Sequence, residues 1–292
     1  MIWLIGNKGM LGTELSLLLE EKYLKFTATD KEIDITDLKS LRDFYKQNSS
    51  DNDPINLIIN CAAYTAVDKA EDDRETCIRI NIEGSRNIAV VSKETDAVMI
   101  HFSTDYVFNG AGNKPYKEDD ETDPIGMYGL SKRNGEIQIQ KENDKSYIIR
   151  TAWLYGKYGN NFVHTMLRLM KEKDAISVVN DQNGSPTWAK DLAQTIIELI
   201  NQSNKNKNIP YGIYHYTNEG VITWFDFAKE ILKQARAFGI LEKDCEVKPC
   251  TSAEFPAKVT RPAYSVLDKT KIKNALGISI PAWNESLKDF LR

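Results

Sequence analysis

The chain has 292 residues, 41% of them hydrophobic and 27% charged, which is enough apolar material for a sizeable buried core. Its formal net charge of -4 argues against binding to nucleic acid or to an anionic membrane, because either would need a basic patch. No basic segment precedes a cleavage site near the start, and no apolar run approaches the roughly 18 residues of a membrane span. We therefore expect a cytoplasmic protein with a small-molecule site and no nucleic-acid or membrane partner.

The first half of the chain alternates β-rich runs with amphipathic stretches, which is typical of a parallel sheet with helices on both faces. The predicted strands are Ile2–Ile5, Lys25–Thr29, Asn56–Asn60, Val98–Ser103 and Tyr147–Thr151. The stretches between them are long enough for right-handed crossover helices and are Met10–Lys22, Asp37–Gln47, Cys77–Glu94 and Gly126–Glu142. The sequence therefore predicts an α/β fold with a doubly wound parallel sheet.

The alternation weakens after Tyr155. The segments that follow are Phe162–Met170, Ile176–Val179 and Trp188–Ile200, then one clear strand at Gly212–Thr217 and further helices. Two polar, turn-rich segments are expected to be surface loops, Asn48–Pro54 and Asn201–Pro210. We infer a smaller C-terminal α/β lobe that is interleaved with the first.

Three glycines, Gly6, Gly9 and Gly12, follow the first predicted strand directly and open the first predicted helix. Glycines in this context permit a tight turn, let the backbone approach a pyrophosphate and let the helix pack closely on the sheet. The helix N-terminus adds N–H donors and the positive end of a dipole. This pattern, with Met10 and Leu11 inside it, predicts a dinucleotide-binding turn of the Rossmann type.

Asp30 ends the second predicted strand, where a carboxylate can accept hydrogen bonds from the adenosine ribose. That carboxylate disfavours the 2′-phosphate of NADP, whereas the ammonium of neighbouring Lys31 can pair with the same phosphate. The sequence leaves NADPH and NADH open, and we expect both to be used. Asp34 and Ile35 are candidates to flank the adenine; the alternative is that Asp34 caps a helix and Ile35 is an apolar anchor.

Tyr128 and Lys132 lie four residues apart, on one face of a predicted helix. A tyrosine has a reference pKa of about 10, so it needs a nearby cation that favours the phenolate before it can exchange a proton near neutral pH. Lys132 can be that cation. Thr104 and Asp105 follow the fourth predicted strand, at the edge where ligands of open α/β sheets bind. The Thr104 hydroxyl is therefore a candidate to bond a substrate carbonyl; the alternative is a plain strand-ending turn.

Four further segments are distinctive enough to compare with known families. They are residues 60–68 (NCAAYTAVD), 103–110 (STDYVFNG), 150–156 (RTAWLYG) and 180–187 (NDQNGSPT). Together with the glycines and the Tyr/Lys pair, and in the same order over nearly the whole chain, they resemble the dTDP-4-dehydrorhamnose reductase family. The glycine pattern and the Tyr/Lys pair are shared by all extended short-chain dehydrogenases, whereas the last three segments are much more specific.

The resemblance implies a catalytic group made of Thr104, Tyr128 and Lys132. It implies that the sugar nucleotide is bordered by Val67, Asp105, Tyr106 and Trp153, and that Ala62, Ala63 and Tyr64 lie along the cofactor. The implied reaction is reduction of the C4 ketone of dTDP-4-dehydro-L-rhamnose to dTDP-L-rhamnose by NADPH or NADH. Such a product is a precursor of cell-surface polysaccharide.

With this resemblance we expect residues 1–156 and 186–218 to form a dinucleotide-binding domain. Residues 157–185 and 219–292 are expected to form a sugar-nucleotide-binding lobe. A dTDP-sugar is the expected ligand, and assembly into a homodimer is left open.

A metal site is not expected. Some family members are described as binding Mg²⁺ between subunits through acidic side chains on the first helix and beyond the 180–187 segment. Glu14 is acidic in this chain, but Lys190 is basic. The three histidines lie on separate predicted elements without metal-like spacing, so structural roles are expected for His101, His164 and His215.

Two other functions stay open at this point. A sugar-nucleotide epimerase shares the glycines and the Tyr/Lys pair but keeps its NAD bound and returns the hydride, so net cofactor turnover separates the two. A non-catalytic regulatory subunit, like the β subunit of methionine adenosyltransferase, also resembles these reductases. A productive turnover number would exclude that reading.

Overall fold

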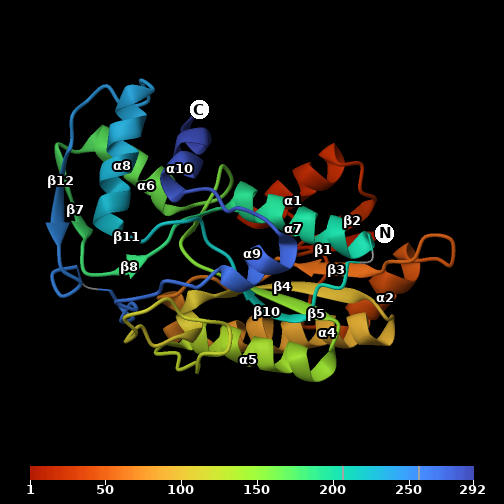
Figure 1. Cartoon of the computed structure of the whole chain (residues 1–292). Helices are drawn as coiled ribbons and strands as arrows, with labels where there is room; N and C mark the ends of the chain where they lie inside the picture. The colour runs from red at the N-terminus through yellow and green to blue at the C-terminus, as the bar shows by residue number, and fades with distance from the viewer. Residues whose placement is uncertain (206, 256) are drawn as a thin grey trace.

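The computed structural model describes residues 1–205, 207–255 and 257–292. Six parallel strands form its central sheet in the order β10-β5-β4-β3-β1-β2 (Figure 1). The strands are β1 Ile2–Ile5, β2 Phe26–Thr29, β3 Leu57–Asn60, β4 Val98–Thr104, β5 Ser146–Thr151 and β10 Gly212–His215. The predicted doubly wound α/β fold is therefore confirmed, with only small shifts at the strand ends.

Helices cover both faces of this sheet (Figure 1). One face carries α1 Met10–Glu21, α7 Ala189–Asn204 and α9 Thr270–Leu276, which pack their leucines and isoleucines on the sheet. The other face carries α2 Leu38–Asn48, α4 Ser85–Glu94 and α5 Met127–Glu142. The order of the strands reverses at β1, which places the turn after β1 at the switch point where ligands of such sheets bind.

The helix expected over Cys77–Glu94 is not continuous. It comprises α3 Arg74–Ile78, a wider π-helical turn η2 at Arg79–Gly84, and α4. Asn81 lies in the wide turn, where its Oδ1 accepts from the backbone N–H of Tyr64 at 2.9 Å and its Nδ2 donates to Ser131 Oγ at 2.9 Å. These tertiary hydrogen bonds accompany the irregular turn and tie the helix to the loop after β3.

The loop expected at Asn201–Pro210 begins later than predicted, because α7 continues to Asn204. Gln202 in this last turn is buried and donates from Nε2 to the carbonyl oxygen of Leu276 at 2.7 Å. Packing against α9 thus extends a helix that polar composition alone would end. Position 206 lies outside the described residues.

A smaller lobe stands beside one end of the sheet (Figure 1). Its strands β7 Ala175–Val179 and β12 Glu246–Cys250 pair in parallel, and α6 Phe162–Glu172, α8 Trp224–Ala237 and α10 Trp283–Leu291 pack around a separate apolar core. Short strand pairs connect it to the rest: β6 Leu154–Tyr155 with β9 Thr187–Trp188, and β8 Asn183–Gly184 with β11 Ile222–Thr223. The proposed division into two domains stays a prediction; α9 packs with Ile272 and Leu276 in the core of the large sheet.

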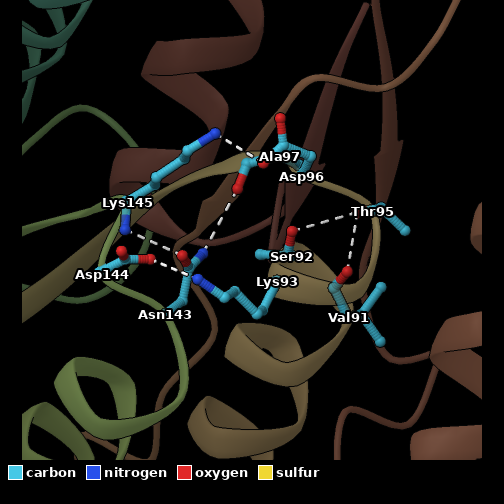
Figure 2. A network of polar contacts seen from close by, with 9 residues as sticks. All are labelled: Val91, Ser92, Lys93, Thr95, Asp96, Ala97, Asn143, Asp144 and Lys145. Carbon is cyan, nitrogen blue, oxygen red and sulfur yellow. Dashed lines mark hydrogen bonds and ion pairs between the residues drawn. The ribbon is translucent and has the colours of Figure 1, made fainter.

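The amino ends of β4 and β5 are joined by a polar network (Figure 2). Buried Asn143 donates from Nδ2 to the carbonyl oxygen of Ala97 at 3.3 Å and accepts from the Lys145 N–H at 2.9 Å. On the solvent side of this network, the Lys145 ammonium forms an ion pair with the Asp96 carboxylate at 2.6 Å. The ends of α4 and α5 are therefore fixed relative to each other.

No helix in the described ranges is long and apolar enough to cross a membrane.

Candidate active site

A cavity of about 500 Å³ lies at the carboxyl ends of β1, β3, β4 and β5. It brings together twelve of the predicted residues, Gly9, Met10, Leu11, Gly12, Ala63, Val67, Thr104, Asp105, Tyr106, Tyr128, Lys132 and Trp153. A second cavity of about 650 Å³ adjoins it and extends toward the smaller lobe. The two share Val67 and Tyr106, so one elongated ligand can occupy both.

The glycine turn fits a dinucleotide. Gly6 has a φ of +80°, and a β-carbon there would lie 2.7 Å from the backbone nitrogen of Ala62. A β-carbon on Gly12 would lie 2.1 Å from the carbonyl oxygen of Gly6. Gly9 precedes α1 without a side-chain cap, so the first N–H groups of the helix keep their capacity to bind an anion beside the cavity. Side chains larger than hydrogen would close this cradle.

Asp30 and Lys31 follow β2 directly, next to the glycine turn but outside the cavity lining. The turn is tied to β2, since the Gly6 N–H donates to the carbonyl oxygen of Thr29 at 2.7 Å. Glu32 accepts from the Asp30 N–H at 2.8 Å and lies 3.7 Å from the ammonium of Lys8. Sequence reasoning missed Lys8 and Glu32 at this edge, although Lys8 stands inside the glycine pattern.

Asp34 and Ile35 lie away from the cavity. Asp34 Oδ1 accepts from the backbone N–H and hydroxyl of Thr36, and Ile35 is buried in the core under the sheet. The cap of α2 is Asp37, which accepts from the Lys39 N–H at 2.9 Å. The alternative that Asp34 caps a helix is therefore wrong, and contact of Asp34 and Ile35 with an adenine stays a prediction.

The loop after β3 carries the residues expected along the cofactor. Ala63 lines the cavity, and the Ala62 N–H donates to Asn60 Oδ1 at 3.0 Å. Tyr64 packs against the small apolar cluster of Ala70, Cys77 and Met127 instead of lining the cavity. The loop is thus held from both sides, by Asn60 at its start and by the wide turn of the following helix.

Thr104 ends β4 and begins a short 3₁₀ turn at Asp105–Val107. Its hydroxyl donates to Asp105 Oδ1 at 3.0 Å and accepts from the Tyr106 N–H at 3.2 Å. Asp105 is 2% exposed, and this burial raises the pKa of its carboxyl to about 6. Burial likewise raises the pKa of Tyr106 to about 12. The end of β4 therefore presents to the cavity the Thr104 hydroxyl and a carboxyl that is a weaker acid than an exposed aspartic acid.

Tyr128 and Lys132 reach the same cavity from the first turns of α5. Burial raises the pKa of the Tyr128 phenol, which keeps it protonated at neutral pH. Burial lowers the pKa of Lys132 to about 8. The Lys132 amine donates to the carbonyl oxygen of Phe102 at 2.7 Å, and within the described ranges no hydrogen bond joins it to the Tyr128 hydroxyl. The pair shares one site, but the lysine is turned toward β4.

Trp153 has a left-handed backbone with a φ of +48°, which is rare for a bulky residue and points to a position held for its side chain. Its indole lines the first cavity and stacks on Trp224 at a centroid distance of 3.6 Å. Trp224, Phe162 and Arg261 line the second cavity. Sequence reasoning missed these three, because they come from distant segments with no motif of their own.

Glu14 is buried on α1, and burial raises the pKa of its carboxyl against the opposing effect of Lys190. Among the residues that the structure describes, no three His, Cys, Asp or Glu side chains gather in a way that could hold a metal ion. Absence of a metal stays a prediction.

Comparisons with known proteins identify the family to which this chain belongs. The family model described as "RmlD substrate binding domain" matches residues 1–292. A dTDP-4-dehydrorhamnose reductase of Aggregatibacter actinomycetemcomitans is 39% identical over 289 residues, which cover 97% of this chain and 96% of that protein.

Solved structures agree with this match. A dTDP-4-dehydrorhamnose reductase from Clostridium acetobutylicum superimposes with a TM-score of 0.90 at 40% identity, covering 99% of this chain and 98% of that one. The Bacillus anthracis dTDP-4-dehydrorhamnose reductase, solved in complex with NADP, gives a TM-score of 0.90 at 39% identity, covering 99% of this chain and 97% of that one. The chain therefore belongs to the dTDP-4-dehydrorhamnose reductase family, whose model is that of the RmlD substrate binding domain.

Proposed function

We propose that this protein reduces the C4 ketone of dTDP-4-dehydro-L-rhamnose to the alcohol of dTDP-L-rhamnose, with NADPH or NADH as reductant. The observation that carries the proposal is the cavity in which a glycine turn, Thr104, Tyr128 and Lys132 meet. Relatives at about 40% identity that carry the name of this reductase support the same reaction. The product serves as a precursor of cell-surface polysaccharide.

The residues present fit a nicotinamide dinucleotide. Gly6 and Gly12 leave room for a pyrophosphate at the uncapped N-terminus of α1, and the cavity runs from there to Tyr128. When bound, the reduced nicotinamide supplies the hydride. The NADP complex of the Bacillus anthracis relative supports NADPH, while Asp30 beside the turn favours NADH.

Tyr128 is assigned as the proton donor to the ketone oxygen. Burial keeps the phenol protonated in this structure, and Lys132 is assigned as the cation that favours the phenolate and so lets the proton leave near neutral pH. Thr104 lies beside Tyr128 at the end of β4. Its hydroxyl donates to Asp105 in this structure and would turn to stabilise the developing oxyanion. Lys132 is assigned to the nicotinamide ribose.

The sugar nucleotide is assigned to the two adjoining cavities. Its ketone belongs next to Thr104 and Tyr128, and its nucleotide end extends past Val67 and Tyr106 into the larger cavity. Arg261 supplies a cation there; it is paired with Asp68 at 2.6 Å. Trp224 supplies an aromatic face. These two roles rest on the positions of the side chains and on the chemistry of the ligand, because a guanidinium pairs with a diphosphate and an indole stacks on a nucleobase.

One assay tests the proposal. Purified protein is mixed with dTDP-4-dehydro-L-rhamnose and either NADPH or NADH, the absorbance of the reduced nicotinamide is followed, and the product is identified by mass and sugar configuration. Stoichiometric loss of the reduced nicotinamide with formation of dTDP-L-rhamnose is expected. An isomerised sugar without net cofactor loss would indicate an epimerase. No turnover by a folded protein that binds both ligands would favour a regulatory subunit.

A cytoplasmic location and a homodimeric state are also part of the proposal. Light scattering after size-exclusion chromatography measures the molar mass, and cell fractionation tests the location. A monomer at assay concentration would contradict the dimer without affecting the assigned reaction.

A further inference from the structure

The arginine that opens the segment 150–156 forms a buried ion pair with the helix that carries the Tyr/Lys pair. Arg150 lies in β5, and Glu136 lies on α5. Arg150 Nε and Nη2 donate to the two carboxylate oxygens of Glu136, at 2.9 and 2.7 Å. Both side chains are 3% exposed, so water does not compete for these hydrogen bonds. The pair is therefore a fixed arrangement of charges, unlike a surface contact whose partners move.

The guanidinium is also held from its other side. His215 Nε2 lies 3.4 Å from Arg150 Nη1, and His215 Nδ1 lies 3.1 Å from the carbonyl oxygen of Tyr116. A carbonyl oxygen can only accept and a guanidinium can only donate, so the imidazole carries its hydrogen on Nδ1 and turns its lone pair to Arg150. Burial lowers the pKa of His215 to about 3, which keeps the ring neutral. The position of Arg150 thus does not depend on Glu136 alone.

Glu136 lies one turn of α5 after Lys132, the candidate cation of the site. Residues four apart lie on the same face of a helix, and both of these side chains are buried. A buried ammonium without an opposite charge is strongly unfavourable. Burial lowers the pKa of Lys132 to about 8, and Glu136 opposes this effect. The ammonium is therefore the major form at neutral pH, but with a margin of only about one pH unit.

The other titratable groups around Lys132 supply no negative charge at neutral pH. They are Cys61 after β3, Cys77 of α3, His101 of β4 and Tyr128 of α5. Burial raises the pKa of both thiols and of the phenol, and it holds the pKa of the imidazole well below its usual range, so all four are uncharged. Asp105 acts on the pKa of the Tyr128 phenol instead. The charge that favours the ammonium therefore comes from Glu136.

We propose that Glu136 is a positioning residue for the reaction: its carboxylate keeps Lys132 charged, and Arg150 fixes that carboxylate and limits its pull on the lysine. Without Arg150, the free carboxylate would attract the amine away from the carbonyl oxygen of Phe102, to which it donates at 2.7 Å. Without Glu136, the guanidinium would remain as a second buried cation. The two partners thus act on the lysine in opposite directions. This inference rests on the proposed function, in which the ammonium favours the phenolate and binds the nicotinamide ribose.

The test follows the titration of Lys132 directly, in the protein without nucleotide. Lysine labelled with ¹³C at Cε is observed by NMR from about pH 6 to pH 10, and the Lys132 signal is the one that Lys132→Met removes. In wild type its midpoint is expected at about 8, well below the 10.5 of an ordinary lysine. The signal therefore titrates apart from those of the exposed lysines.

Two variants of Glu136 separate its charge from its shape. Glu136→Gln keeps the shape and removes the charge, so the midpoint should fall by about one pH unit. Glu136→Asp keeps the charge on a shorter side chain and should restore the midpoint to within about half a unit of wild type. The matched control is Glu14→Gln, the same replacement at a buried glutamate of α1, which should leave the midpoint in place.

Arg150→Gln provides the opposite change. It frees the carboxylate from its partner, so the midpoint should rise. Removing one partner of a buried ion pair can prevent folding. In that case Glu136→Gln combined with Arg150→Gln, which places two amides where the ion pair was, decides the question. Its midpoint should also fall, because Glu136 is the partner that acts on the pKa of Lys132.

The proposal is overturned if the midpoint of Glu136→Gln, or of the double variant where the single one does not fold, equals that of wild type. A fall in both single variants, or an equal fall in Glu14→Gln, would overturn it too, since the pair would then act only through the fold. Reductase turnover with unshifted midpoints would retain the proposed function and remove this inference. The expected shifts in a protein that neither binds NADPH nor turns over would retain the charge relation and remove the reductase assignment.

Discussion

The indole rings of Trp153 and Trp224 stack at a centroid distance of 3.6 Å across the boundary between the two cavities. Trp153 follows β5 of the large sheet, and Trp224 begins α8 of the smaller lobe. The pair therefore joins the part of the chain that carries the catalytic candidates to the part that is assigned to the nucleotide.

Trp224→Ala should weaken binding of the sugar nucleotide. Loss of an aromatic face costs on the order of 1 kcal/mol beyond the lost area, so KM for the dTDP-sugar should rise by about tenfold while KM for NADPH stays the same. Steady-state kinetics with each substrate varied in turn measure both constants. The control is Phe238→Ala at the exposed end of the same helix, which should change neither. Equal increases in both KM values would contradict the assignment of Trp224.

Tyr128→Phe should lower kcat by about 10²- to 10⁴-fold, because only the proton donor is lost and the ring still packs. Cofactor affinity, measured by fluorescence titration, should stay within about twofold. Tyr147→Phe is the matched control: its buried hydroxyl donates to the Ile209 carbonyl oxygen at 2.9 Å, away from the cavity. That variant should keep its kcat. A Tyr128→Phe enzyme that retains more than about a tenth of kcat would show that another group supplies the proton.

Asp105 should make stability depend on pH. Its pKa is about 6 in the folded protein against 3.8 in the unfolded chain, so the folded state retains a proton that the unfolded state releases. This contribution to stability is complete below pH 3.8 and is lost as the pH rises through about 6. Asp105→Asn removes the titration and retains an oxygen for the Thr104 hydroxyl.

Relative to wild type, Asp105→Asn should gain on the order of 3 kcal/mol in unfolding free energy between acidic and neutral pH. Urea unfolding of both proteins from about pH 4 to pH 7 provides the comparison. Parallel curves over this range would mean that the carboxyl titrates near its ordinary pKa and is better hydrated than the structure indicates.

Cofactor choice should depend on the residues that follow β2. A carboxylate within a few ångströms of a 2′-phosphate costs on the order of 1–4 kcal/mol, and the Lys31 ammonium offsets part of this. Asp30→Ala should therefore improve NADPH relative to NADH, and Lys31→Ala should do the reverse. The measurement is the ratio of kcat/KM for the two cofactors. A ratio that moves by less than about twofold in both variants would place these side chains away from the adenosine ribose.

The sequence by itself predicted the sheet, its crossover helices and the glycine turn after β1, because these features depend on local patterns. Alternating apolar runs specify strands whatever lies around them, and Gly6 and Gly12 are needed wherever a chain turns this tightly. The specific segments at 103–110 and 150–156 identified the family for the same reason, since each is contiguous in the chain.

Only the tertiary structure decided which distant groups meet. The wide turn at Asn81, the last turn of α7 around Gln202 and the stack of Trp153 on Trp224 all depend on partners many residues away. His101 illustrates the limit most clearly: its sequence position indicates a buried structural residue, and its burial is confirmed. That its ring nitrogens lie 3.0 Å from Asn60 Nδ2 and 3.1 Å from Lys132 Nζ depends on how β3, β4 and α5 pack together, which no periodicity or spacing encodes.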